Sequence, residues 1–141
     1  MNTPPIVIVD TDAIVAQVHV EDTNHTKSIQ ITKKLLDLKA RVIYPASAVI
    51  EAVTVLQHKL NKKAVAYETA KTLILENAEI TEINSEVLFL AVNSYFTSKT
   101  SKKNTLFDCV VAATAKSYGA DAIFSFDRFY KSKGFKLAAD L

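Results

Sequence analysis

The chain contains few of the residues that interrupt regular structure. Its 141 residues include two glycines and three prolines, so we expect short connections between closely spaced helices and strands. Gly119 and Gly134 are the only glycines. This excludes a glycine-rich loop that would bind phosphate through its backbone amides.

Cysteine is almost absent as well. Cys109 is the single cysteine, so an internal disulfide is impossible, and its apolar helical surroundings predict a small core residue. A reducing compartment is the simpler expectation. The three histidines, His19, His25 and His58, do not have the spacing of metal ligands.

Long hydrophobic runs are also missing. No stretch approaches the roughly 18 apolar residues of a membrane helix. The first ten residues, MNTPPIVIVD, lack the basic region of a signal peptide. We therefore expect a cytoplasmic protein with no membrane segment.

The composition that remains is that of one globular domain, residues 1–141. Hydrophobic residues make up 49% of the chain and charged residues 23%, which excludes disorder and allows a substantial core. The net charge of +2 neither requires nor excludes nucleic acid as a partner.

Predicted strands and helices alternate along the chain. β-branched or alternating segments predict strands at 6–9, 41–44, 79–83 and 121–126, with a last edge strand at 135–138. Helical periodicity predicts helices at 13–20, from 22 or 23 to about 38, 47–60, 64–77, from 84 or 85 to about 95, and 105–118, with a helical turn at 128–132. This order predicts an α/β fold with a central parallel sheet and helices on both faces. Right-handed crossovers would place the carboxyl ends of the strands at one edge.

Residues 104–127, NTLFDCVVAATAKSYGADAIFSFD, form the unit around which the chain is organised. The pattern predicts a helix from Thr105 to Tyr118, a left-handed residue at Gly119 and a buried strand that ends near Asp127. An acid stands at each end of the unit, because Asp108 lies in the first turn of the helix. Ligands in such folds bind at the carboxyl ends of the strands.

Each acid also has an ordinary structural interpretation. Asp10 can end a strand, Asp12 can cap the helix at 13–20, and Asp127 can cap the turn that follows the last strand. Asp108 follows Thr105 in the T-x-x-D spacing of a capping box. Glu51 differs, because it lies in an apolar helix and a buried glutamate normally has a partner.

Taken together, these acids indicate a metal site. Carboxylates that converge at one edge repel one another, and a hard divalent cation such as Mg²⁺ or Mn²⁺ removes that cost. Such a site suits metal-assisted hydrolysis of phosphodiester bonds.

Four segments, in order, resemble a known family. They are IVDTDAIVA (8–16), SAVIEAVTVL (47–56), NTLFDCVVAATAKSYGA (104–120) and IFSFDRFY (123–130). The set resembles the PIN domain, and within it the VapC-type toxin ribonucleases.

This resemblance implies a Mg²⁺- or Mn²⁺-dependent endoribonuclease, acting as the toxin of a toxin–antitoxin pair. Asp10, Glu51 and Asp108 would be the core metal ligands, and Asp127 a fourth acid that serves a second metal or positions water. A homodimer and a protein antitoxin are further implications. Thr11 and Ser125 match hydroxyl positions of the family and would help to position the substrate.

Asp12 departs from the family pattern, which usually has Asn, Ser or another small residue at this position. It either adds a fifth carboxylate near the metal or only caps its helix, and the cap is the favoured interpretation.

Two basic clusters flank the acidic segments in sequence. Lys99, Lys102 and Lys103 precede the Asp108 helix, and Arg128 follows Asp127. They are candidate contacts to RNA phosphates. The alternative is that they are ordinary solvated side chains.

Two other functions compete with the nuclease. Asp10-Thr11-Asp12 loosely fits the D-x-D signature of haloacid-dehalogenase-type phosphatases, but the later Gly-Asp motif of that superfamily is absent. The other alternative is a PIN-like fold that only binds, in which the acids are structural.

Overall fold

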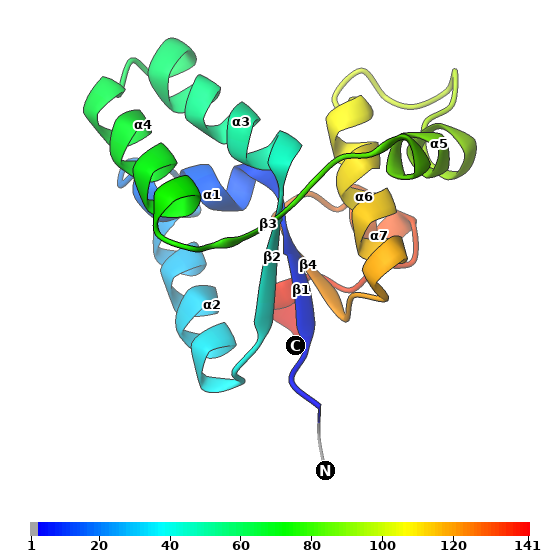
Figure 1. The fold of residues 1–141 in the computed structure, drawn as a ribbon, viewed down its shortest axis with the longest axis horizontal. Coiled ribbons are helices and arrows are strands. Elements are labelled where there is room, and N and C mark those ends of the chain that lie inside the picture. Colours follow the sequence, from blue (N-terminus) through cyan, green and yellow to red (C-terminus); the bar gives the residue numbers. More distant parts are fainter. Residues whose placement is uncertain (1–2) are drawn as a thin grey trace.

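The computed structural model describes residues 3–141 and contains a four-stranded, wholly parallel sheet (Figure 1). The strands are β1 (Ile6–Val9), β2 (Arg41–Pro45), β3 (Glu79–Thr81) and β4 (Ala122–Phe124), in the order β3-β2-β1-β4. The α/β class and the parallel sheet predicted from the sequence are confirmed. All four carboxyl ends therefore lie at one edge of the sheet.

Helices cover both faces of the sheet, as expected. Figure 1 shows one group of helices on each side of the sheet. The first group is α1 (Thr11–Val18), α2 (His25–Asp37), α3 (Ala46–Thr54) and α4 (Lys63–Ala70), and the second is α5 (Ser85–Ser94), α6 (Leu106–Tyr118) and α7 (Phe129–Ser132). Helices α3 and α4 continue into π-helical turns at Val55–Lys59 and Lys71–Leu75. Among residues 3–141, no helix has the length and apolarity needed to cross a membrane.

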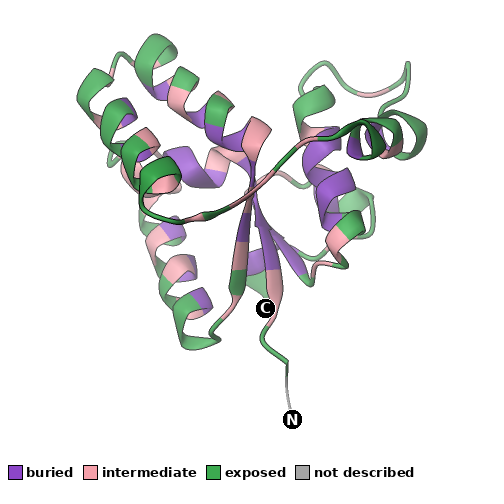
Figure 2. Cartoon of the chain, in the orientation of Figure 1, coloured by how far each residue is buried: buried purple, intermediate pink, exposed green. Residues whose placement is uncertain are grey.

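Strand β1 separates two hydrophobic cores. Val7 and Val9 pack with the first group of helices, and Ile8 packs with α5 and α6. All three side chains are fully buried, and Figure 2 shows the strand lined by buried residues at the centre of the molecule. This burial on both faces explains why residues 6–9 form an unbroken β-branched run.

Three predicted helix starts differ from the structure, and that of α1 affects the site. Helix α1 begins at Thr11 with Asp10 as its N-cap, so Asp12 does not cap a helix at 13–20. Helix α3 begins at Ala46 directly after Pro45, and the buried Ser47 hydroxyl has no hydrogen-bond partner. Proline has a fixed φ that suits the position before a helix, so the helix starts without a side-chain cap. Helix α2 also starts later than predicted, at His25.

The predicted edge strand at 135–138 is also wrong. Leu137 forms one isolated parallel bridge with Ile123, and a 3₁₀ turn at Ala138–Asp140 follows. Strands β3 and β4 are shorter than the predicted 79–83 and 121–126.

Several local predictions are confirmed. The backbone N–H of Thr105 donates to Asp108 Oδ2 at 2.9 Å, as a capping box requires. Gly119 ends α6 at φ +59°, in the left-handed region. Asn84 caps α5 by accepting from Val87 N, and Cys109 is buried.

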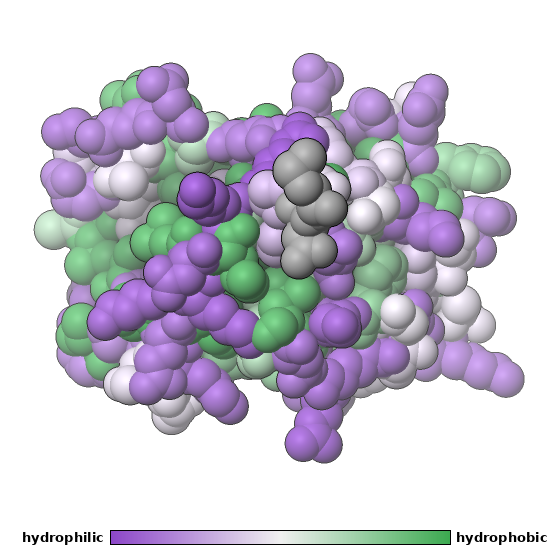
Figure 3. All heavy atoms as spheres, turned by 90° about the horizontal axis from the view of Figure 1, so that it is seen from below, coloured by the Kyte–Doolittle hydropathy of each residue, from purple (hydrophilic) through white to green (hydrophobic). Residues whose placement is uncertain are grey.

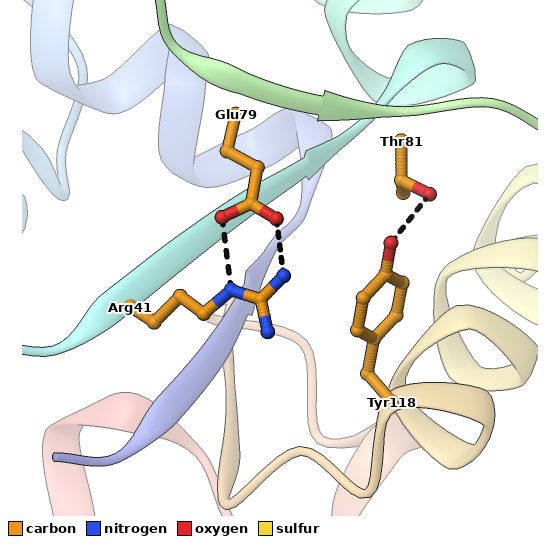
Figure 4. Close-up of polar contacts among 4 residues, drawn as sticks. All are labelled: Arg41, Glu79, Thr81 and Tyr118. Carbon is orange, nitrogen blue, oxygen red and sulfur yellow. Dashed lines mark hydrogen bonds and ion pairs between the residues drawn. The ribbon is translucent and has the colours of Figure 1, made fainter.

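Surface side chains hold the edge strand β3 in place (Figure 4). Arg41 on β2 donates two hydrogen bonds, of 2.9 and 2.5 Å, to Glu79 on β3. Tyr118, the last residue of α6, donates to Thr81 Oγ1 at 2.9 Å. The guanidinium of Arg41 also lies 5.6 Å from the centre of the Tyr118 ring. These contacts fix the short strand to its neighbours.

Candidate metal centre

The four predicted acids reach the carboxyl edge of the sheet from different elements. Asp10 directly follows β1, and Asp127 follows β4 by three residues. Glu51 lies on α3 and Asp108 in the first turn of α6. Figure 1 shows α3 and α6 on opposite sides of the upper, carboxyl end of β1. The fold thus brings both helices to the edge where the sequence predicts a ligand site.

Asp10 is the most buried of these acids, with 4% of its surface exposed. Its backbone N–H continues the sheet by donating to Phe124 O at 3.0 Å. The carboxylate accepts from Thr11 N through Oδ1 at 2.8 Å. Through Oδ2 it accepts from Ser125 Oγ at 3.0 Å and from the Tyr130 hydroxyl at 2.8 Å. Asp10 therefore ends a strand, caps a helix and forms the centre of a hydrogen-bond network.

Glu51 has a partner, as its place in an apolar helix predicts. The Thr11 hydroxyl donates to Glu51 Oε1 at 2.5 Å. The partner is therefore a neutral hydroxyl, and it leaves the charge of Glu51 in place. This contact also gives Thr11 a definite position beside the acids.

Asn104 joins the other two acids. Its side-chain amide donates to Asp127 Oδ2 at 2.8 Å and lies 3.5 Å from Asp108 Oδ2. Asp127 also accepts from Phe129 N through Oδ1, which confirms the predicted cap on the turn after the last strand. Asp108 and Asp127 therefore combine structural roles with their position at the site.

Asp12 belongs to the same network. Its Oδ2 accepts from Phe126 N at 2.9 Å and from Ser125 Oγ at 3.1 Å. Its Oδ1 is buried and has no hydrogen-bond partner. Asp12 thus ties the first turn of α1 to the loop after β4, where Ser125 Oγ also accepts from Asp127 N at 3.1 Å.

Burial and mutual repulsion raise the pKa values of several of these acids. Burial raises the pKa of Asp10 well above its usual range, and the charges of Asp12 and Asp108 raise it further. Burial raises the pKa of Asp12 to about 6, with a smaller contribution from Asp127. Burial is also the main cause of the raised pKa of Glu51, to which the charge of Asp108 adds, and of the raised pKa of Asp108, to which the charge of Asp127 adds. Such perturbed acids in one place mark a candidate functional site.

Within the described part of the chain, no basic side chain forms an ion pair with these carboxylates. The ion pairs found in residues 3–141 join Arg41 to Glu79, Lys62 to Glu21 and Lys131 to Asp140, all outside the acidic edge. The acidic edge is therefore a concentration of unpaired negative charge inside a partly buried environment.

The donor chemistry fits a hard divalent cation. The five acids offer only oxygen ligands, which Mg²⁺ prefers, and the buried Oδ1 of Asp12 lacks any partner. However, residues 3–141 contain no group of three His, Cys, Asp or Glu side chains that could hold a metal ion as they stand. Thr11, Ser125, Tyr130 and Asn104 occupy carboxylate oxygens with hydrogen bonds. A bound cation would therefore displace part of this network.

Two residues of the site were missed by the sequence interpretation, Tyr130 and Asn104. A buried tyrosine needs a partner for its hydroxyl, so the apolar turn after Asp127 was a usable signal for Tyr130. The sequence indicates a role for Asn104 only weakly, because the residue to which its side chain donates, Asp127, lies 23 positions away.

The predicted RNA contacts are all exposed. Lys99, Lys102 and Lys103 lie in the loop between α5 and α6, and Arg128 precedes α7. Lys102 and Asn104 line a hollow of about 400 Å³ in this loop. Because Asn104 also contacts Asp127, the hollow adjoins the acidic edge.

Comparison with known proteins identifies the fold and the family of the chain. No curated protein matches the chain significantly. Among solved structures, the chain is similar to the Sarcin-Ricin loop cleaving toxin VapC20 of Mycobacterium tuberculosis, with a TM-score of 0.76 and 18% identity over 92% of this chain and 95% of that one. At that identity the similarity concerns the fold. The model of the PIN domain matches residues 7–136, which include every acid of the site, and the chain therefore belongs to the PIN domain family.

Proposed function

We propose that this protein is a metal-dependent endoribonuclease that hydrolyses RNA phosphodiester bonds as the toxin of a toxin–antitoxin pair. The observation that carries the proposal is the set of unneutralised carboxylates at the carboxyl edge of the sheet: Asp10, Asp12, Glu51, Asp108 and Asp127. The PIN domain match and the fold shared with an RNA-cleaving toxin support it.

Asp10, Glu51 and Asp108 would hold Mg²⁺ or Mn²⁺, with Asp127 as the fourth acid. A cation held there would supply a Lewis acid that polarises a phosphoryl oxygen and lowers the pKa of water. Thr11 orients Glu51 through the 2.5 Å hydrogen bond. Ser125 links the Asp10 carboxylate to the backbone of Asp127 and so fixes the spacing between two acids.

RNA would approach over the loop between α5 and α6. The exposed Lys99, Lys102, Lys103 and Arg128 place positive charge beside an acidic centre that would otherwise repel phosphates. The hollow beside Lys102 is also lined by Asn104, whose side-chain amide contacts Asp127.

Exposed apolar side chains support the proposal that this protein binds protein partners, namely a second copy of the chain and an antitoxin. Phe89 on α5 is 72% exposed, and Leu88, Val92 and Phe96 lie on or beside the same helix. A separate hollow of about 430 Å³ lies between α1 and α4. It is lined by Tyr44 among others, and by none of the five acids of the proposed site. Figure 3 shows further hydrophobic surface on the side of α1–α4.

The phosphatase alternative is less compatible with the sequence. The D-x-D match at Asp10-Thr11-Asp12 is loose, and the later Gly-Asp motif of that superfamily is absent. The stronger alternative to the nuclease is a PIN-like protein that only binds, in which the acids are structural.

The decisive experiment is cleavage of mixed cellular RNA by the purified protein, with Mg²⁺, with Mn²⁺ and with a chelator. We expect cleavage with metal and none with chelator. Asp108→Asn keeps an acceptor for Thr105 N and removes the charge, so it should be folded and inactive. Asp37→Asn, at the exposed end of α2, is the matched control and should be fully active.

Thermal melting separates the nuclease from the binding-only alternative. A cation at a hundredfold excess over its Kd should stabilise the wild type by about 2.7 kcal/mol. Asp108→Asn should lose most of this stabilisation. If Mg²⁺ and Mn²⁺ leave the melting temperature of the wild type unchanged, and the wild type cuts no RNA, the nuclease proposal is contradicted.

A further inference from the structure

Tyr130 lies beneath two of the proposed metal ligands. It belongs to the short helix α7 and is fully buried. Its hydroxyl lies 2.8 Å from Asp10 Oδ2 and 3.5 Å from Asp108 Oδ1. The phenolic proton can serve one acceptor at a time, and the shorter distance assigns it to Asp10.

The oxygens of Asp10 are not equivalent. Oδ2 accepts from two hydroxyls, those of Tyr130 and Ser125, whereas Oδ1 accepts only from Thr11 N. A carboxylate oxygen has two lone pairs. Oδ2 is therefore saturated, and Oδ1 keeps one lone pair free for a cation.

The two hydroxyl donors also differ. Ser125 Oγ lies 3.0 Å from Asp10 Oδ2 and 3.1 Å from Asp12 Oδ2, so its single proton is shared between two carboxylates. Tyr130 has no comparable second acceptor, since Asp108 Oδ1 lies at the limit of hydrogen-bonding distance. Tyr130 therefore donates its proton to Asp10 alone, whereas Ser125 divides its proton between Asp10 and Asp12.

We infer that Tyr130 is a positioning residue whose hydroxyl fixes the rotation of the Asp10 carboxylate and presents Oδ1 to a bound divalent cation. The inference rests on the proposed function and adds a residue to it. Tyr130 acts through Asp10, as a hydrogen-bonded neighbour of a metal ligand. A phenylalanine would fill the same space and leave Oδ2 dependent on the shared proton of Ser125.

The test is Mn²⁺ binding by isothermal titration calorimetry, well below the melting temperature, for wild type, Tyr130→Phe and Tyr118→Phe. Tyr118 is the matched control, because its hydroxyl donates one hydrogen bond to Thr81, on a different strand. Loss of such a neighbour of a ligand typically weakens metal binding by about 10–100-fold. We expect that weakening for Tyr130→Phe, an unchanged Kd for Tyr118→Phe, and RNA cleavage by Tyr130→Phe restored at saturating Mn²⁺.

The outcomes separate this inference from the nuclease proposal. If wild type and Tyr130→Phe bind Mn²⁺ equally and both cut RNA, the inference fails and the nuclease stands. If the wild type neither binds Mn²⁺ nor cuts RNA, both fail. A lower melting temperature with an unchanged Kd would show that the hydroxyl serves stability alone, which also overturns the inference.

A second measurement needs no variant at position 130. In wild-type protein labelled with ¹³C at tyrosine Cζ, the NMR signal of Tyr130 should shift during a Mg²⁺ titration, while that of Tyr118 should not. Signals of the other tyrosines are assigned with their own Tyr→Phe variants. A Tyr130 signal that stays fixed while Mg²⁺ binds would overturn the inference even if Tyr130→Phe does not fold.

Discussion

Thr11 Oγ1 donates a hydrogen bond of 2.5 Å to Glu51 Oε1. The two residues are 40 positions apart, and the contact joins the start of α1 to the middle of α3. The hydrogen bond orients the Glu51 carboxylate and leaves its negative charge in place. A carboxylate oriented in this way is prepared to bind a cation.

Thr11→Val should therefore weaken metal binding while the fold persists. Valine has nearly the same shape but no hydroxyl, so Glu51 loses its donor. We expect Mn²⁺ affinity to fall by about tenfold, as for other hydrogen-bonded neighbours of ligands. Calorimetry measures this, and Thr11→Ser, which keeps the hydroxyl, should stay close to wild type. Equal weakening in both variants would contradict the role of the hydroxyl.

Stability of the metal-free protein should increase as the pH is lowered from 7.5 to 5.5. Burial raises the pKa of Asp12 to about 6 and that of Asp10 well above its usual range. The folded state then binds more protons than the unfolded state, so this stability is present at low pH and is lost as pH rises through about 6. At about 1.4 kcal/mol per pKa unit, Asp12 contributes at most on the order of 3 kcal/mol.

Urea unfolding with chelator at pH 7.5, 6.5 and 5.5 measures this dependence. Asp12→Asn should flatten the profile, because it removes one of the titrating groups. Mn²⁺ affinity should change in the opposite direction and weaken at pH 5.5, since protons compete for the same oxygens. A free energy of unfolding that is highest at pH 7.5 would contradict the prediction.

Substitutions of Asp12 should separate its hydrogen bonds from its charge. Asp12→Ala leaves Phe126 N, which now donates to Asp12 Oδ2 at 2.9 Å, without its partner. The cost of such an unpaired group is about 1–3 kcal/mol. Asp12→Asn keeps an acceptor and loses a buried charge, so at pH 7.5 it should be at least as stable as the wild type. Chemical denaturation of both variants tests this, and equal destabilisation would show that the charge is required.

Lysines of the loop between α5 and α6 should contribute to RNA affinity through phosphate contacts. For single-stranded RNA each contact adds about 0.7 to the slope of log affinity against log salt. Lys102→Ala with Lys103→Ala should therefore weaken binding and reduce that slope by up to about 1.4. The control pair is Lys27→Ala with Lys33→Ala, which are exposed on α2. Fluorescence anisotropy across a salt series gives the slopes. Identical slopes for both pairs would show that the loop does not contact RNA phosphates.

The parts of the fold and site that were predictable depend on local patterns. The β-branched run at 6–9 indicates a strand buried on both faces, and such strands meet at one edge. The capping box of Thr105 and Asp108 spans three residues. Glu51 stands out because a glutamate rarely lies in an apolar helix without a partner.

The parts that were not predictable depend on competition or on long-range packing. Asp10 and Asp12 are both good N-caps, and only the sheet hydrogen bond from Asp10 N to Phe124 O decides between them. The contact between Tyr130 and Asp10 spans 120 residues. Its existence depends on how Tyr130 packs in one core with Ile8 and Ile123, which periodicity does not encode.

The position of β1 between β2 and β4 also bears on how strongly different parts of the site are protected from hydrogen exchange. The amide of Asp10 is paired within the sheet, next to a fully buried strand. It should therefore exchange with deuterium only when the whole domain unfolds. Asp127 lies on a loop outside the sheet, and its side chain is held by Asn104 from another loop. The amide of Asp127 donates to the Ser125 hydroxyl on that loop, so it should exchange before the amide of Asp10, and the two acids of one site differ in how far the domain must open to expose them.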